Sequence, residues 1–157
     1  MALQALGPIG QGLLDGRSSA EIVGFELKIR IRALEASQGQ QSNVIERIGI
    51  IDTGASHVLI DRRTAKTLGL RARNKGSAEL ASGEHLLATI YNGVVEAPEL
   101  GVSLITELYA FEEQMASPRV LIGRSFLRNF LVTFDGPSGI VTFAKPISYS
   151  VNPIDDE

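Results

Sequence analysis

The clearest pattern along the chain is an alternation of apolar and polar positions that begins at Val23. Six apolar residues alternate with charged or small ones, in the order Val23, Phe25, Leu27, Ile29, Ile31 and Ala33. A period of two is typical of a half-buried strand. A polar loop, ASQGQQSN, then leads to a second strand expected at residues 44–51, directly before Asp52. The two strands are expected to form a hairpin.

Shorter elements follow in the middle of the chain. Asp61 precedes RRTAKTL, which predicts a short helix capped by Asp61 and ended by Gly69 in the left-handed conformation. The stretch SAELASGEHLLATI predicts a second hairpin with a flexible tip at Ser82 and Gly83. The pair Asn92-Gly93 is typical of a turn or of a bulge in a long strand, and the sequence leaves both open.

The C-terminal half is also mostly strand-like. Strands are expected at 102–110 and 119–122, a short helix near Phe126, and a final hairpin in LVTFDGPSGIVTF. Many strands with only two short helices indicate a mainly β fold, closed or sandwich-like. Residues 1–20 are rich in Gly and Ser and predict an arm or linker, and residues 148–157 an acidic tail. One domain is therefore expected over residues 21–147.

Composition narrows the class of protein. A chain of 157 residues fits one domain, and 44% hydrophobic and 21% charged residues are typical of a globular protein. The net charge of −3 disfavours nucleic acid as a partner, so the basic run at 62–75 is expected to be a solvated face. Zero cysteines and two histidines exclude thiolate chemistry and disfavour a metal cage. No cofactor or metal is expected.

The same sequence offers no membrane signal. No apolar run reaches the roughly 20 residues that cross a bilayer. The first residues lack a basic region, and Gly and Pro interrupt their apolar stretch, which is unlike a secretory signal. A cytoplasmic or a processed protein without a membrane partner is the expectation.

The candidate chemistry lies in IIDTGAS, at the end of the second predicted strand. An isolated ionised carboxylate in a core costs several kcal/mol, so an aspartate there points to chemistry rather than folding. Two similar stretches, LLDG (Leu13 to Gly16) and TFDG (Thr133 to Gly136), are expected to be simple turns. IIDTGAS differs because Thr and Gly follow Asp52, and because VLIGRSFL occurs about seventy residues further along.

On these two motifs the sequence resembles the retropepsin-like aspartic peptidases. The Asp-Thr-Gly-Ala motif is Asp52 to Ala55, the apolar-apolar-Gly-Arg motif is Leu121 to Arg124, and the resemblance spans about Val23 to Phe143. It implies a single-domain closed β-barrel, the acid-protease lobe, with one or two short helices. It also implies roles for particular residues: Asp52, Thr53 and Gly54 in catalysis; Ala55, Ser56, His57, Ser82 and Gly83 in substrate binding; Gly123 and Arg124 in structure and the dimer contact.

The resemblance implies an aspartic endopeptidase that acts on an extended peptide or protein. Two carboxylates about 3 Å apart share one proton, so one activates water and the other protonates the peptide carbonyl. Only one Asp-Thr-Gly is present, so the second Asp52 is expected from an identical subunit across a two-fold axis.

Two departures from the retroviral pattern leave an alternative open. An acidic residue that often pairs with the arginine is Ser56 here, and Arg124 is followed by Ser125. The partner of Arg124 is therefore open, and Arg124 could be an ordinary surface arginine. A catalytically silent dimerisation or peptide-binding module of the same fold is the alternative function.

Overall fold

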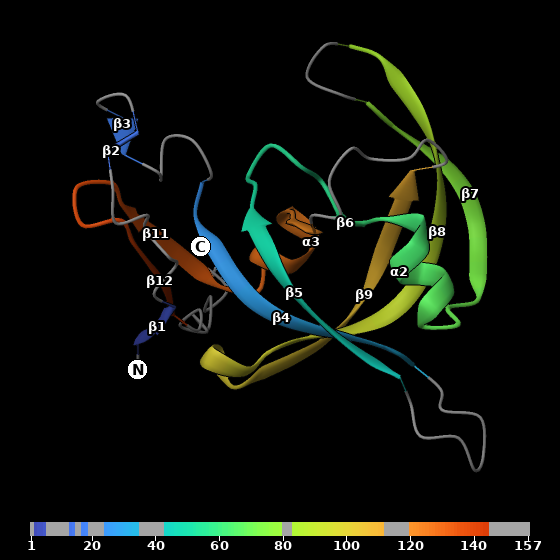
Figure 1. Cartoon of the computed structure of the whole chain (residues 1–157), viewed down its shortest axis with the longest axis horizontal. Coiled ribbons are helices and arrows are strands. Elements are labelled where there is room, and N and C mark those ends of the chain that lie inside the picture. The colour runs from blue at the N-terminus through green and yellow to red at the C-terminus, as the bar shows by residue number, and fades with distance from the viewer. Residues whose placement is uncertain are drawn as a thin grey trace, which may run out of the picture.

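The computed structural model describes residues 2–5, 13–14, 17–18, 24–34, 43–79, 83–111 and 120–144 (Figure 1). Short strands occupy the N-terminal part: β1 (Ala2–Ala5), β2 (Leu13–Leu14) and β3 (Arg17–Ser18). The central strands are β4 (Glu26–Ala33), β5 (Val44–Ile51), β6 (Val58–Ile60), β7 (Ala72–Glu79), β8 (His85–Ala97), β9 (Val102–Phe111) and β10 (Val120–Ile122). The chain then continues through β11 (Leu131–Asp135) and β12 (Ile140–Ala144).

Helices are few in these ranges. They are α2 (Arg62–Thr67), α3 (Arg124–Leu127) and a 3₁₀ turn, η1 (Pro98–Leu100). None of these described helices has the length and apolar character needed to cross a bilayer.

Six strands close into a barrel. Their order is β4-β5-β10-β6-β9-β8, and β8 returns to pair with β4. Residues 93–96 of β8 make the closing pairs with β4, whereas residues 85–91 pair with β7. One end of β8 therefore belongs to the barrel wall, and the other carries β7 as a projecting hairpin (Figure 1). The prediction of a mainly β, closed, single-domain fold is confirmed.

The barrel interior is filled by alternate residues of its strands. On β4, Leu27, Ile29 and Ile31 are buried while Lys28 and Arg30 are exposed, as the period of two predicts. Burial of each such side chain contributes about 1.5–3 kcal/mol. The largest fully buried side chains include Phe126 of α3 and Phe143 of β12, which belong to this core.

Local signals predicted the hairpins and the first helix correctly. β4 and β5 are antiparallel, with Leu27 opposite Gly49. Asp61 Oδ1 accepts a hydrogen bond from the Thr64 N–H at 2.8 Å and so caps α2. Gly69 follows with φ +65°, the left-handed conformation that ends helices.

The pair Asn92-Gly93 forms neither of the predicted features. β8 runs through it, and its pairs with β9 continue without a shift. The irregularity lies instead in β7, between Ala72 and Asn74. A Cβ on Gly93 would lie 2.5 Å from Leu108 Cδ1 and 3.2 Å from the Arg32 carbonyl oxygen. Glycine therefore serves close packing where β4, β8 and β9 meet, and the turn and bulge predictions were both wrong.

The N-terminal arm contains strands that the sequence pattern did not predict. β1 pairs with β12, Ala2 opposite Ala144, and extends the β11–β12 hairpin to a three-stranded sheet. β2 and β3 pair around Asp15-Gly16, two residues outside the described ranges. Four residues are too few to show a clear period of two, and the strand pairs with a hairpin far away in the sequence. The sequence pattern therefore could not predict it. The acidic tail at 148–157 also lies outside the described residues, and the domain limits stay a prediction.

Candidate active site

The Asp-Thr-Gly loop, residues 52–57, crosses the end of β10. β5 leads into the loop and β6 leaves it, and β10 lies between them, parallel to β5 and antiparallel to β6. The Asp52 N–H donates to the Ile122 carbonyl oxygen at 3.0 Å, which anchors the loop at its first residue. The strand order thus brings the two sequence motifs together.

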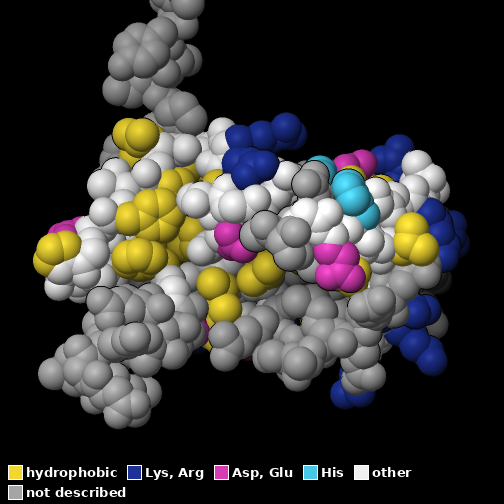
Figure 2. All heavy atoms as spheres, turned by 90° about the horizontal axis from the view of Figure 1, so that it is seen from above, with side chains coloured by type: hydrophobic (Ala, Val, Ile, Leu, Met, Phe, Trp, Pro, Cys, Tyr) yellow, Lys and Arg dark blue, Asp and Glu magenta, His cyan; other side chains and the backbone are white. Residues whose placement is uncertain are grey.

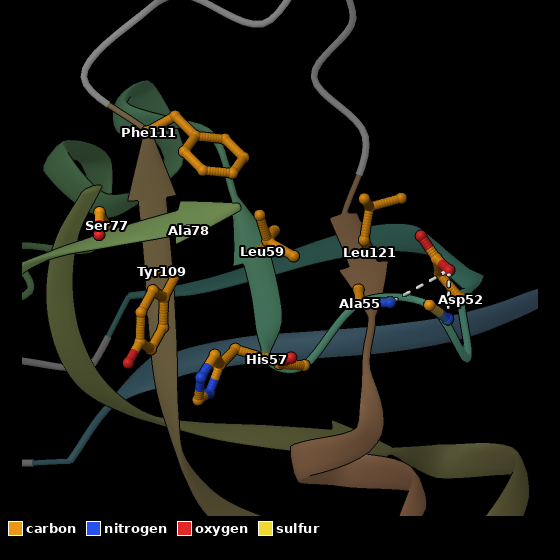
Figure 3. Close-up of a pocket in the computed structure, with 11 residues that line it drawn as sticks. Asp52, Ala55, His57, Leu59, Ser77, Ala78, Tyr109, Phe111 and Leu121 are labelled. Carbon is orange, nitrogen blue, oxygen red and sulfur yellow. Dashed lines mark hydrogen bonds between the residues drawn. The ribbon is translucent and has the colours of Figure 1, made fainter. Parts of the chain in front are cut away.

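The loop's own backbone holds the Asp52 side chain. Asp52 Oδ1 accepts hydrogen bonds from the Gly54 N–H at 2.8 Å and the Ala55 N–H at 3.3 Å (Figure 3). Asp52 is half-buried, and it lines a cavity of about 520 Å³. The carboxylate is therefore fixed in direction while it stays accessible from the cavity.

Gly123 allows the two motifs to touch through their backbones. The Arg124 N–H donates to the Ala55 carbonyl oxygen at 2.9 Å, and the Ser125 N–H donates to the Ser56 carbonyl oxygen at 3.0 Å. A Cβ on Gly123 would lie 2.7 Å from the Ala55 oxygen and closer still to the His57 oxygen. No other residue fits there without movement of the loop backbone.

The Arg124 guanidinium has three partners, all in the Asp-Thr-Gly loop. Nη1 donates to the carbonyl oxygens of Thr53 at 2.8 Å and Gly54 at 3.0 Å. Nη2 donates to Ser56 Oγ at 2.7 Å. The Ser56 hydroxyl therefore accepts a hydrogen bond from Arg124 at the position where the retroviral pattern often has a carboxylate. Arg124 is thus not a free surface arginine.

The cavity walls include some of the predicted substrate-binding residues. Ala55, Ser56 and His57 line the cavity, as does Gly54. Thr53 is exposed and, like Gly123 and Arg124, is not part of the wall. Gly83 is exposed with φ +83° and has open space around it, which suits a hairpin tip, whereas Ser82 lies outside the described residues.

Sequence reasoning missed the apolar part of the cavity wall. It consists of Leu59, Ala78, Tyr109, Phe111 and Leu121, and the polar Ser77 lies next to Ala78 (Figure 3). Tyr109 and Phe111 alternate along β9 with the buried Leu108 and Ala110, so a period of two was the available signal. Leu59 and Phe111 of this wall form a second, smaller apolar cluster together with Ala88.

His57 stacks on Tyr109, with ring centroids 4.0 Å apart and an interplanar angle of 13°. Burial lowers the pKa of His57, the nearby Glu107 carboxylate opposes that shift, and Arg124 and Arg128 lower the pKa further. The imidazole is therefore neutral near pH 7. His85 lies exposed at the start of β8. Among the residues described, no group of three His, Asp or Glu side chains could hold a metal ion.

The closed barrel, the Asp-Thr-Gly loop across β10 and the arginine that binds the loop together define a retropepsin-like aspartic protease fold. The chain belongs to the family of gag-polyprotein putative aspartyl proteases, whose model matches residues 43–129. That match includes both sequence motifs and the strands that connect them.

Solved structures of similar proteins were also found. A retropepsin-like aspartic protease from Rickettsia conorii is 16% identical, with a TM-score of 0.49 over 76% of this chain and 80% of that one. The retroviral protease-like domain of Ddi1 from Leishmania major is 15% identical, with a TM-score of 0.44 over 80% and 97% of the two chains. No curated protein sequence matches.

Proposed function

We propose that the protein is a homodimeric aspartic endopeptidase in which each subunit supplies one Asp52. The observation that carries this proposal is the acid content of the cavity. Asp52 is the only acidic residue among the described residues that line it. Acid–base hydrolysis without a metal needs a second carboxylate, and a two-fold axis beside the loop would supply the same residue from a partner.

The proposed reaction uses a water molecule and one shared proton. The ionised Asp52 takes a proton from water as the oxygen attacks the peptide carbonyl carbon, and the protonated Asp52 of the partner donates its proton to the carbonyl oxygen. The resulting tetrahedral diol then collapses. One hydroxyl gives its proton to the ionised Asp52 of the partner subunit, the amide nitrogen accepts the proton that Asp52 took from water, and the C–N bond breaks to give an acid and an amine.

Surface features of the loop support a two-fold partner. Thr53 and Gly54 are exposed beside Asp52, and the Thr53 hydroxyl makes no hydrogen bond within the described part of the chain. An apolar surface lies on β11, where Leu131 is 65% and Phe134 39% exposed. Figure 2 shows hydrophobic side chains gathered at that end of the molecule. Coverage of the β11 surface by an identical chain would remove apolar area from water.

The shape of the cavity supports an extended peptide as substrate. Leu59, Phe111 and Leu121 offer apolar surface to the side chains beside the cleaved bond, and β7 contributes Ser77 and Ala78 from the projecting hairpin. That hairpin, with Gly83 near its tip, is the element proposed to close over the peptide.

Subunit mixing tests the shared pair of carboxylates. Wild-type and Asp52→Asn chains are exchanged to equilibrium in equal amounts, and hydrolysis of a mixed peptide library is measured. Random pairing leaves about one quarter of the dimers with two intact aspartates, so activity per total protein falls to about one quarter. A self-contained site would instead retain about half. Activity should also fall when the protein is diluted below its dimer dissociation constant.

A null result would favour the alternative function. If the wild-type protein cleaves no peptide in the library at micromolar concentration, yet still dimerises or binds peptide, the chain is a silent module of the same fold. The alternative function was left open because the sequence offered no partner for Arg124. The hydrogen bonds from Arg124 to Thr53 and Ser56 supply such partners and therefore favour the enzyme.

A further inference from the structure

A second cavity, of about 380 Å³, adjoins the first at His57. Its other polar lining residues come from β7, β8, β9 and the region of α3, and they are Arg73, Asn92, Thr106, Glu107, Ser125, Arg128 and Asn129. His57 lines both cavities, and in Figure 3 its ring stands beside Tyr109, across Ala55 from Asp52. A chain that passes along the first cavity away from Asp52 therefore meets the second one at this ring.

The second cavity carries more positive than negative charge. Arg73 Nη1 lies 3.9 Å from Glu107 Oε1 and 3.4 Å from Asn92 Oδ1, both at the long end for such contacts. The Arg128 side chain has no ion pair or hydrogen bond to any described residue. Two guanidinium groups thus face one loosely paired carboxylate. Because arginine stays charged at every physiological pH, this excess does not depend on His57.

Two polar atoms in the wall have no partner. Ser125 Oγ and His57 Nδ1 are both buried and make no hydrogen bond to the described chain. Leaving such an atom unpaired costs about 1–3 kcal/mol. The Ser125 hydroxyl can therefore turn toward an incoming acceptor without losing an existing hydrogen bond.

We propose that this cavity binds an acidic side chain, aspartate or glutamate, of the peptide whose neighbouring residues occupy the first cavity. The inference rests on the proposed function and adds a substrate class to it. In an extended peptide successive side chains advance by about 3.3 Å and alternate in direction, so a residue near the cleaved bond reaches beyond His57. An arginine fork binds a carboxylate through two parallel hydrogen bonds, and Arg128 is free to do so.

Peptides in which a charged residue is moved from position to position test this inference. Aspartate, asparagine and lysine are placed in turn at each position of a peptide cleaved by the wild-type protein, and kcat/KM is measured. At one position outside the cleaved pair, aspartate should exceed its isostere asparagine by about three- to tenfold, mainly through KM, and lysine should be the poorest. The preference should weaken with added salt.

Arginine variants locate the preference. Arg128→Gln and Arg73→Gln should each reduce the aspartate-to-asparagine ratio toward one, mainly by raising the KM of the aspartate peptide. Arg71→Gln is the matched control: it removes the same charge from an exposed residue two positions before Arg73 that does not line the cavity. A preference for lysine, no preference at any position, or an unchanged ratio in Arg128→Gln would overturn the inference.

A binding measurement separates this inference from the proposed function. Binding of labelled peptides from the same series to the Asp52→Asn protein is measured by fluorescence anisotropy. This measurement does not require the peptide to be cleaved. If the aspartate peptide binds more tightly than the asparagine peptide, and if adding Arg128→Gln to the Asp52→Asn protein abolishes this difference, the result supports the proposed binding of an acidic side chain. This conclusion holds even if no peptide is ever cleaved. Equal binding of the aspartate and asparagine peptides by a protein that does cleave them rejects the acidic site alone.

Discussion

Asp52 and Asp135 are locally alike. Asp52 directly follows β5, and Asp135 is the last residue of β11. In each case a carboxylate oxygen accepts a hydrogen bond from a backbone N–H a few residues ahead: Gly54 N–H at 2.8 Å for Asp52, and Ser138 N–H at 3.3 Å for Asp135. The hydrogen bonds from Ser138 lower the pKa of Asp135. By local geometry alone, both are strand-end turns.

What differs is the packing around the two loops. The Asp52 loop crosses β10, receives three hydrogen bonds from Arg124 and lines a cavity. The Asp135 hairpin is exposed, and a Cβ on Gly136 would meet nothing within 4 Å. A turn becomes a candidate catalytic loop through the remote residues that support it, and the predictions below test that difference.

Asp52→Asn should produce the largest effect. The substitution keeps the shape of the side chain and removes its acid–base function, so hydrolysis of a cleaved peptide should fall at least about a hundredfold. Asp135→Asn, the matched change in the exposed hairpin, should leave kcat/KM unchanged. Peptide hydrolysis and circular dichroism on both purified variants check this. Substantial turnover by Asp52→Asn would remove the basis of the catalytic assignment.

Arg124→Gln should come next, because it breaks the contact between the two motifs. Loss of the hydrogen bonds to Thr53, Gly54 and Ser56 frees the loop, and a displacement of about 1 Å in a catalytic group can cost about a hundredfold in rate. Ser56→Asp sharpens the test. A carboxylate there makes a charge-assisted bond to Arg124, so it should raise the melting temperature. Wild-type kcat/KM in Arg124→Gln would contradict a supporting role for Arg124.

Gly123→Ala should destabilise the fold by about 1–3 kcal/mol, the usual range for overpacking. The added methyl group would collide with backbone oxygens of the Asp-Thr-Gly loop, and backbone cannot rotate away as a side chain can. Gly136→Ala is the control, since its methyl group would meet open space. Urea unfolding of both variants measures the difference, and equal midpoints would show that the two loops are packed alike.

Asp61→Ala should have the smallest effect, about 1 kcal/mol at neutral pH, because Asp61 only caps α2. Burial alone would raise the pKa of Asp61, but hydrogen bonds from Thr64 and Arg63 outweigh it and lower the pKa. A depressed pKa stabilises the fold above the unfolded value, near about 3.9, and this contribution is lost as pH falls through the folded value. Unfolding at neutral and acidic pH should therefore show the two proteins converging in acid.

Much of the fold was predictable because its signals are local. The alternation on β4, the cap of Asp61 and the left-handed Gly69 each depend on residues a few positions apart. Gly93 was misread because its signal was not local. The Asn-Gly pair is typical of turns, yet the glycine serves packing against Leu108 and Arg32.

The sequence by itself also indicated where the candidate site lies, because Asp52-Thr53-Gly54 and Gly123-Arg124 are short motifs whose residue types and order suffice to recognise them. Only the tertiary structure decided what those motifs contact. Ser56 accepts a hydrogen bond from Arg124, 68 residues away, and the cavity wall combines β6, β7, β9 and β10. Such contacts depend on strand order and register across a closed barrel, which many distant pairings fix together and no short stretch encodes.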